Sequence, residues 1–149
     1  MTEFELNLND LLVDTFNFIL KYEESSLKAI SGAPITVTEA HIIEAIAKKG
    51  EHASVSKVAS SLGVAVPTIT VAVKKLEKKG LVTKIPCAED GRRLMISLTD
   101  LGKRINRAHG IFHRKMVRNI EENFSEGEKE VLLSAIKKLS IFFREKVEA

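Results

Sequence analysis

The sequence predicts a mainly α-helical fold with one small β-hairpin, and three observations support this fold class. Apolar residues recur at helical spacing in six separate segments of the 149-residue chain. Glycine, proline or a helix-capping residue marks the ends of most of these segments. Between the fourth and fifth segments, residues 81–98 contain two short β-type runs on either side of a turn. We therefore expect four helices, a hairpin and two further helices.

A long first helix is expected from about Leu6 to Ile30, and the Gly-Ala-Pro sequence at residues 32–34 should end it. The apolar residues on one face of this helix are Leu8, Leu12, Phe16, Ile19, Leu27 and Ile30. Three short helices should follow, and their capping or first residues are Thr38, Ser54 and Pro67. The glycines that should close them are Gly50, Gly63 and Gly80.

The hairpin is expected from residues 81–85 and 94–98, because every second residue of the later run is apolar. The connecting turn carries an acid, a glycine and two cations, Asp90, Gly91, Arg92 and Arg93. We expect Arg92 to project from the tip, with the Asp90 carboxylate orienting its guanidinium. Such an arginine is suited to a narrow minor groove of DNA, where negative potential is concentrated.

Two amphipathic helices are expected after the hairpin. Thr99 should cap the first of them, whose apolar stripe consists of Leu101, Ile105, Ala108, Phe112, Met116 and Ile120. Ser125 and Glu128 form a capping box for the last helix. The apolar residues of that helix are Leu132, Ile136, Leu139 and Phe143.

Two short helices joined at Gly63 and followed by a hairpin form a winged helix-turn-helix, whose second helix enters the major groove of DNA. In that second helix, Ile69, Val73 and Leu76 should pack inward. The residues expected to contact DNA are Ser54, Pro67, Thr68, Thr70, Val71, Lys74, Lys75, Lys78, Asp90, Arg92 and Arg93. An ordinary solvated helix face would also carry lysines, so the basic hairpin tip is the observation that favours DNA.

The charge distribution agrees with a polyanionic partner. The net charge is only +3, but residues 66–104 contain nine Lys and Arg against four Asp and Glu. Cys87 is the single cysteine, so the chain forms no internal disulfide, as is usual in the cytoplasm. No apolar run approaches the length of a membrane-spanning helix. We therefore expect a cytoplasmic protein with no membrane partner.

The sequence does not predict an enzyme. It has no glycine-rich phosphate loop and no G-x-S-x-G motif. His109 and His113 lack the H-E-x-x-H pattern of a metallohydrolase, because Gly110 follows the first histidine. We expect no required cofactor.

Two motifs resemble those of the MarR family of winged helix-turn-helix transcriptional regulators. The sequence DGRRLMISLT at residues 90–99 matches the family's wing pattern D-x-R-x-x-x-x-x-L-T. TVAVKKLEKKGLV at residues 70–82 resembles its recognition helix and the strand that follows. The resemblance covers essentially the whole chain and implies a bacterial or archaeal regulator, in most cases a repressor. Such a regulator binds a pseudo-palindromic double-stranded operator as a homodimer.

This resemblance also implies a domain organisation. Residues 1–149 would form a single domain of this type, with residues 33–101 as the DNA-binding part. Residues 1–32 and 102–149 would supply the dimerisation helices. The apolar stripes of the terminal helices agree with this, because they exceed what one small core requires.

Within the family, residues 39–46 (EAHIIEAI) and 108–128 (AHGIFHRKMVRNIEENFSEGE) resemble a branch that represses fatty-acid synthesis genes. That branch implies a long-chain acyl group on acyl carrier protein as corepressor. A third kind of effector is an aromatic or drug-like compound. Candidates for lining a ligand cavity are Phe16, Tyr22 and Phe112, although core packing would also explain each of them.

A zinc-sensing branch of the same family, which represses metal-uptake genes, is the second possibility. It places one glutamate and three histidines at positions similar to Glu24, His41, His109 and His113. His109 and His113 are four residues apart and share one helix face, and a Glu/His₃ set suits tetrahedral Zn²⁺. Hydrogen-bonded histidines at a dimer or domain junction would leave the same pattern.

Overall fold

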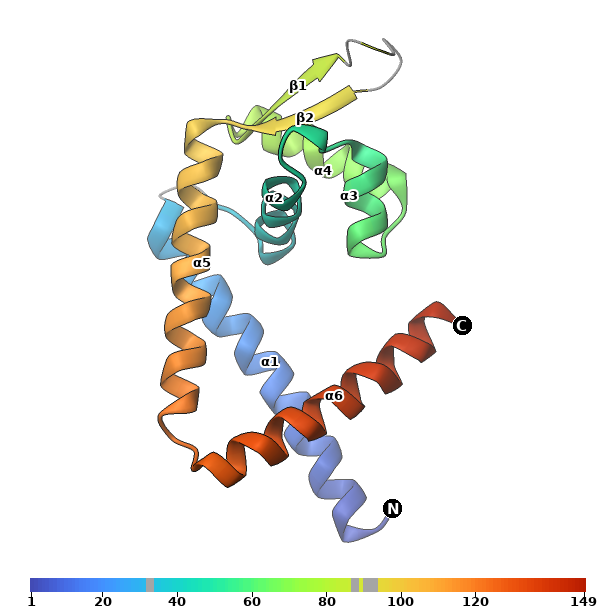
Figure 1. Cartoon of the computed structure of the whole chain (residues 1–149), viewed down its shortest axis with the longest axis vertical. Coiled ribbons are helices and arrows are strands. Elements are labelled where there is room, and N and C mark those ends of the chain that lie inside the picture. Colours follow the sequence, from blue (N-terminus) through green and yellow to red (C-terminus); the bar gives the residue numbers. More distant parts are fainter. Residues whose placement is uncertain (32–33, 87–88, 90–93) are drawn as a thin grey trace. The chain divides into compact units, whose positions relative to one another are not determined.

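The computed structural model describes residues 1–31, 34–86, 89 and 94–149. Its elements are α1 (Glu3–Ser31), α2 (Val37–Lys49), the 3₁₀-helix η1 (Gly50–His52), α3 (Val55–Leu62), α4 (Val66–Lys78), β1 (Val82–Pro86), β2 (Leu94–Leu98), α5 (Asp100–Glu121) and α6 (Glu126–Glu148). Figure 1 shows this order, with the antiparallel hairpin between α4 and α5. The arrangement confirms the predicted winged helix-turn-helix fold class.

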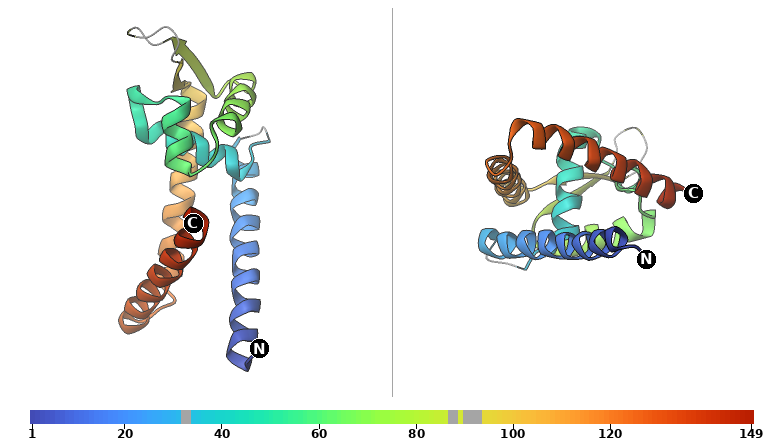
Figure 2. Two further views of the ribbon diagram at one scale, coloured as in Figure 1. Left: turned by 90° about the vertical axis from the view of Figure 1, so that its right-hand side faces the viewer. Right: turned by 90° about the horizontal axis from the view of Figure 1, so that it is seen from below.

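The first helix is the longest, and Figure 2 shows α1 as one uninterrupted rod. The predicted N-cap of α2 was wrong by two residues, because Thr36 occupies that position and Thr38 lies inside the helix. The Thr36 hydroxyl oxygen accepts the backbone N–H of Glu39 at 3.0 Å. Thr36 and Glu39 have the spacing of a capping box, so this signal was present in the sequence.

Two other helix starts that follow the sequence prediction have serine caps. The Ser54 hydroxyl oxygen accepts the backbone N–H of Lys57 and caps α3. At the start of α6, Ser125 and Glu128 bond reciprocally through side chain and backbone. The hydrogen bonds from Ser125, first of all from its backbone N–H, hold the pKa of Glu128 below its ordinary value. Both caps satisfy N–H groups that a helix start leaves without partners.

The chain forms two compact units, residues 1–110 and 111–149. The core of the first unit contains buried apolar side chains from α1, α2, α3, α4, the hairpin and the first turns of α5. The largest of these are Leu27, Ile42, Ile43, Ile46, Ile69, Leu76, Leu81, Val58, Val73 and Val82. Because apolar burial drives folding, this core fixes the three short helices around one centre.

The turn between α3 and α4 depends on Gly63. Its φ of 66° lies in the left-handed region, which glycine adopts without steric strain because it has no Cβ. The Gly63 N–H donates to the carbonyl groups of Ala59 and Ser60, which closes α3. This tight turn sets α4 against α3 in the helix-turn-helix arrangement.

The hairpin is attached to its neighbours at several backbone positions. The register runs from Val82 opposite Leu98 to Pro86 opposite Leu94. On the other edge of β2, the Ile96 N–H donates to the Ala53 carbonyl at 2.9 Å. The Thr99 hydroxyl donates to the Gly80 carbonyl at 2.7 Å, which links the start of α5 to the turn after α4. The base of the hairpin is therefore fixed relative to α4.

Among the described helices, none alone is long and apolar enough to cross a membrane. The pair α3 and α4 meets the length and composition criterion only when taken together, and its two helices meet at a bend of 115°.

Gly102 of α5 should be more sensitive to substitution than Gly127 of α6. A Cβ at this position would collide with the Leu81 carbonyl oxygen, whereas a Cβ at Gly127 in α6 would meet nothing within 4 Å. Alanine gains about 1 kcal/mol of helix propensity over glycine, but the collision forces a backbone shift that costs roughly 1–3 kcal/mol. We expect Gly102→Ala to lower the melting temperature and Gly127→Ala to raise it slightly. Thermal unfolding followed by circular dichroism measures both. An equal rise in the two variants would contradict the close approach at Gly102.

Candidate nucleic-acid interface and carboxylate–histidine cluster

Helix α4 has one buried and one exposed face. Ile69, Val73 and Leu76 are at most 1% exposed, as the sequence predicted. The side chains on the opposite and flanking positions are exposed, and they are Pro67, Thr68, Val71, Lys74, Lys75 and Lys78. Val71, at 55% exposure, offers a methyl-bearing surface among these polar groups. Such a face can contact thymine methyl groups, base edges and phosphates.

Two predicted contact residues already have partners within the protein. The Thr70 hydroxyl donates to the Val66 carbonyl at 3.1 Å, so its single donor is used in the helix. The Ser54 hydroxyl caps α3 and is half-buried. The hydroxyl oxygen of Thr70 keeps acceptor capacity, but donation to a base or phosphate would first require it to rotate away from its own helix.

The predicted wing-tip residues Asp90, Arg92 and Arg93 lie outside the described residues, and so does Cys87. The described strands β1 and β2 have the length and antiparallel pairing expected of a wing. The role of the tip in minor-groove binding therefore stays a prediction from the sequence.

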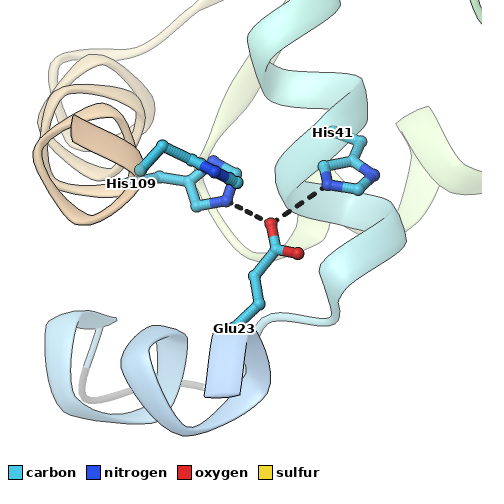
Figure 3. A group of neighbouring side chains, drawn as sticks. Glu23, His41 and His109 are labelled. Atoms are coloured by element: carbon cyan, nitrogen blue, oxygen red, sulfur yellow. Dashed lines mark hydrogen bonds and ion pairs between the residues drawn. The ribbon is translucent and has the colours of Figure 1, made fainter. Parts of the chain in front are cut away.

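A carboxylate joins two imidazoles inside the first compact unit. Figure 3 shows Glu23 of α1 pointing toward His41 of α2 and His109 of α5. One oxygen, Glu23 Oε1, lies 2.6 Å from His109 Nε2 and 3.0 Å from His41 Nε2. The Glu23 and His109 side chains are 5% and 2% exposed, whereas His41 is 44% exposed. Glu23 and His109 are thus buried, and solvent reaches the cluster at His41.

Glu23 takes the place that the sequence analysis gave to Glu24, whose side chain is exposed. Helix periodicity explains the difference. Glu23 stands four residues before the fully buried Leu27 and three after the half-buried Leu20, on the inner face of α1. Glu24 falls one position around the helix and faces outward. This spacing was available in the sequence and would have identified Glu23.

The three side chains suit a small divalent cation. Their ligand atoms all lie within 4.8 Å of one another. Tetrahedral ligands at Zn²⁺ bond lengths stand about 3.3 Å apart, so the 2.6 Å and 3.0 Å separations would have to widen by about 0.7 Å and about 0.3 Å. Without a metal, the same atoms form a hydrogen-bonded group in which imidazole N–H donors meet one carboxylate oxygen.

His113, the fourth residue of the predicted set, lies one turn after His109 on the continuous helix α5, beyond the boundary at residue 110. It is half-buried, and its ring meets the edge of Phe112 with centroids 5.3 Å apart. The spacing of four residues places His109 and His113 on one face of α5.

The three aromatic candidates for a ligand cavity do not share one environment. Phe16 and Tyr22 are 64% and 51% exposed, whereas Phe112 is 9% exposed. A cavity of about 930 Å³ lies elsewhere, between the end of α2, the hairpin and the first turns of α5. Its lining includes Ile46, Ile85, Met95, Lys103 and Arg107, and none of the three aromatic residues. Their role in ligand binding stays a prediction.

The helix-turn-helix with an exposed α4 face, followed by an anchored hairpin, defines a winged helix-turn-helix DNA-binding protein. Comparison with known proteins adds the family. Residues 33–93 match the MarR family, and this part of the chain is similar to the members of that family. The matching family and relatives are transcription regulators, not enzymes.

Known relatives cover most of the chain. A DNA complex of Streptococcus pneumoniae FabT is 29% identical, with a TM-score of 0.85 over 95% of this chain and 98% of that one. The transcriptional regulator ZitR of Lactococcus lactis is 26% identical over 117 residues, which are 76% of this chain and 79% of ZitR. The S. aureus MepR–DNA complex is 20% identical, with a TM-score of 0.73 over 89% and 94% of the two chains, and shows the common fold.

Lys75 provides a test of the α4 interface. Its exposed side chain can contact a phosphate but no buried group. We expect Lys75→Ala to weaken binding to specific and nonspecific duplexes alike. The slope of log K against log salt should fall by about one, because one phosphate contact is lost. Fluorescence anisotropy over a salt series measures this slope. An unchanged affinity and slope would remove Lys75 from the interface.

Proposed function

We propose that the protein is a homodimeric transcriptional repressor that binds a pseudo-palindromic operator and responds to a small effector. The exposed face of α4 is the observation that carries this proposal. In a two-fold symmetric dimer, two such helices would enter successive major grooves about 34 Å apart. Arg92 of each wing would reach the adjacent minor groove, with Asp90 orienting it and Arg93 beside it. A protein with this activity would act in the bacterial or archaeal cytoplasm, where the chromosome is located.

The terminal helices supply the argument for a dimer. Large apolar side chains of α1 are exposed in the single chain, among them Phe4, Leu11, Phe16 and Phe18. The same is true in α6 of Val131, Leu133, Ile136, Ile141, Phe142 and Phe143. Exposed apolar surface on this scale is unfavourable in water and marks an interaction site. A second copy of the chain would cover both helices.

A long-chain acyl group on acyl carrier protein is the first candidate effector. It is supported by the resemblance of residues 39–46 and 108–128 to the fatty-acid branch, and the likeness to FabT over almost the whole chain agrees with it. In this version, the acylated carrier acts as corepressor and strengthens operator binding.

Zinc is the second candidate effector, and the cluster of Glu23, His41 and His109 favours it. These three residues would hold the ion. Bound Zn²⁺ would be coordinated by the Glu23 carboxylate and by the neutral imidazoles, and its positive charge would hold these groups together. Because Glu23, His41 and His109 come from α1, α2 and α5, occupancy would fix the parts of these helices that carry them relative to one another. The target genes would then be those for metal uptake.

Substitution of two neighbouring glutamates, Glu23 and Glu24, tests whether zinc is the effector. If zinc is the effector, wild-type protein should retain the ion in native mass spectrometry, and Glu23→Gln and His41→Ala should lose it. Glu24→Gln, one residue away and exposed, is the matched control and should keep it. Thermal unfolding would show whether the Glu23 variant is folded.

The acyl candidate predicts a different result. Addition of a long-chain acyl carrier protein should raise operator affinity in the wild type and equally in His41→Ala, with no metal present. If metal-replete wild type carries no zinc, the second candidate fails. If acylated carrier leaves affinity unchanged, the first one fails.

A further inference from the structure

Lys79 differs from the other lysines at the end of α4. It follows the helix as its C-cap, and its side chain is only 30% exposed. Its ammonium donates to the Pro34 carbonyl at 2.8 Å and to the Glu39 carboxylate oxygens at 2.8 Å and 2.9 Å. Three acceptors match the three N–H donors of an ammonium group. This lysine therefore points into the protein, while Lys74, Lys75 and Lys78 are exposed.

The acceptor Glu39 needs this partner. Its side chain is 10% exposed and lies in the first turn of α2. One carboxylate oxygen also accepts the Thr36 hydroxyl, at 3.3 Å. A buried carboxylate without an opposite charge is costly, so the Lys79 ammonium compensates it in place. Thr36, Glu39, Lys79 and Pro34 form one network, which we call the Lys79 network.

The Lys79 network connects three parts of the fold. It joins the end of α4 to the first turn of α2, and it holds the Pro34 carbonyl in the segment between α1 and α2. The buried apolar face of α4 resists separation but is non-directional, because apolar contacts have little angular preference. Charge-assisted hydrogen bonds do have preferred directions. The network therefore restricts how α4 can tilt about its own core contacts.

A small tilt of α4 at Lys79 would displace the residues at the N-terminal end of this helix. Thr68 lies eleven residues before Lys79, which is about 16 Å along a helix with a 1.5 Å rise per residue. Over that length, a tilt of about 5° moves the first turn of α4 by more than about 1 Å, enough to misalign hydrogen bonds to base edges.

We propose that Lys79 is a positioning residue for operator recognition. It acts on DNA through the orientation of α4 and makes no contact with phosphate. This inference rests on the proposed operator binding and adds a residue that the exposed face alone does not identify.

The test uses Lys79→Met, which keeps most of the apolar stem and removes the donors. The probes are a duplex selected by the wild-type protein from a random pool and a scrambled duplex of the same length. We expect about a tenfold loss of affinity for the selected duplex, the size of one lost base contact. Binding to the scrambled duplex should change little, and the salt slope on both should stay at the wild-type value.

Three variants control this result. Lys48→Met breaks the exposed Lys48–Glu44 pair in α2 and should leave binding unchanged. Lys79→Arg keeps the charge and hydrogen-bond donors, so it should lose less affinity than Lys79→Met. Adding Glu39→Gln to Lys79→Met should cause no further loss, because both changes break the same network.

Each contrary outcome has a distinct meaning. A salt slope lower by about one would show that Lys79 contacts phosphate. An equal loss on both duplexes, with a lower melting temperature, would show that it only stabilises the fold. Either result overturns the positioning role. If the wild type selects no duplex at all, the proposed function fails before this inference is reached.

Discussion

The burial of one face of α4 is the constraint on which the rest of the account depends. Ile69, Val73 and Leu76 are at most 1% exposed, so α4 is held in the orientation in which these three side chains leave water. The opposite side, with short hydroxyls, a valine and lysines, is then exposed without any further adjustment. The proposed DNA contacts follow from this division of a single helix into two faces.

Directional polar contacts add what apolar burial cannot supply. Thr99 links the start of α5 to the turn after α4, and Lys79 links the end of α4 to Glu39 in α2. Glu23 links α1 to α2 and α5 through two imidazoles. In each case a hydrogen bond joins segments distant in the sequence. An effector that changes the Glu23 contacts would act on helices that are already joined to the DNA-binding part.

The sequence predicted features whose signals are local. Each of these features depends on residues within a few positions of one another. They are the Ser54 cap, the turn at Gly63, the capping box of Ser125 and Glu128, and the two faces of α4. The sequence analysis named Glu24 instead of Glu23 because it assigned the face of α1 without considering the position of the buried Leu27. Lys79 was hidden for another reason, because its partners lie 40 and 45 residues away and nothing near it in the chain marks an inward lysine.

We propose that two copies of α4, held by their buried faces, contact one duplex. Chemical footprinting of the wild-type protein on a duplex selected from a random pool tests it most directly. We predict two protected major-groove segments on the same face of the DNA, with centres one helical turn, about 10–10.5 base pairs, apart. A single protected segment, or protection confined to the minor groove, would contradict the account.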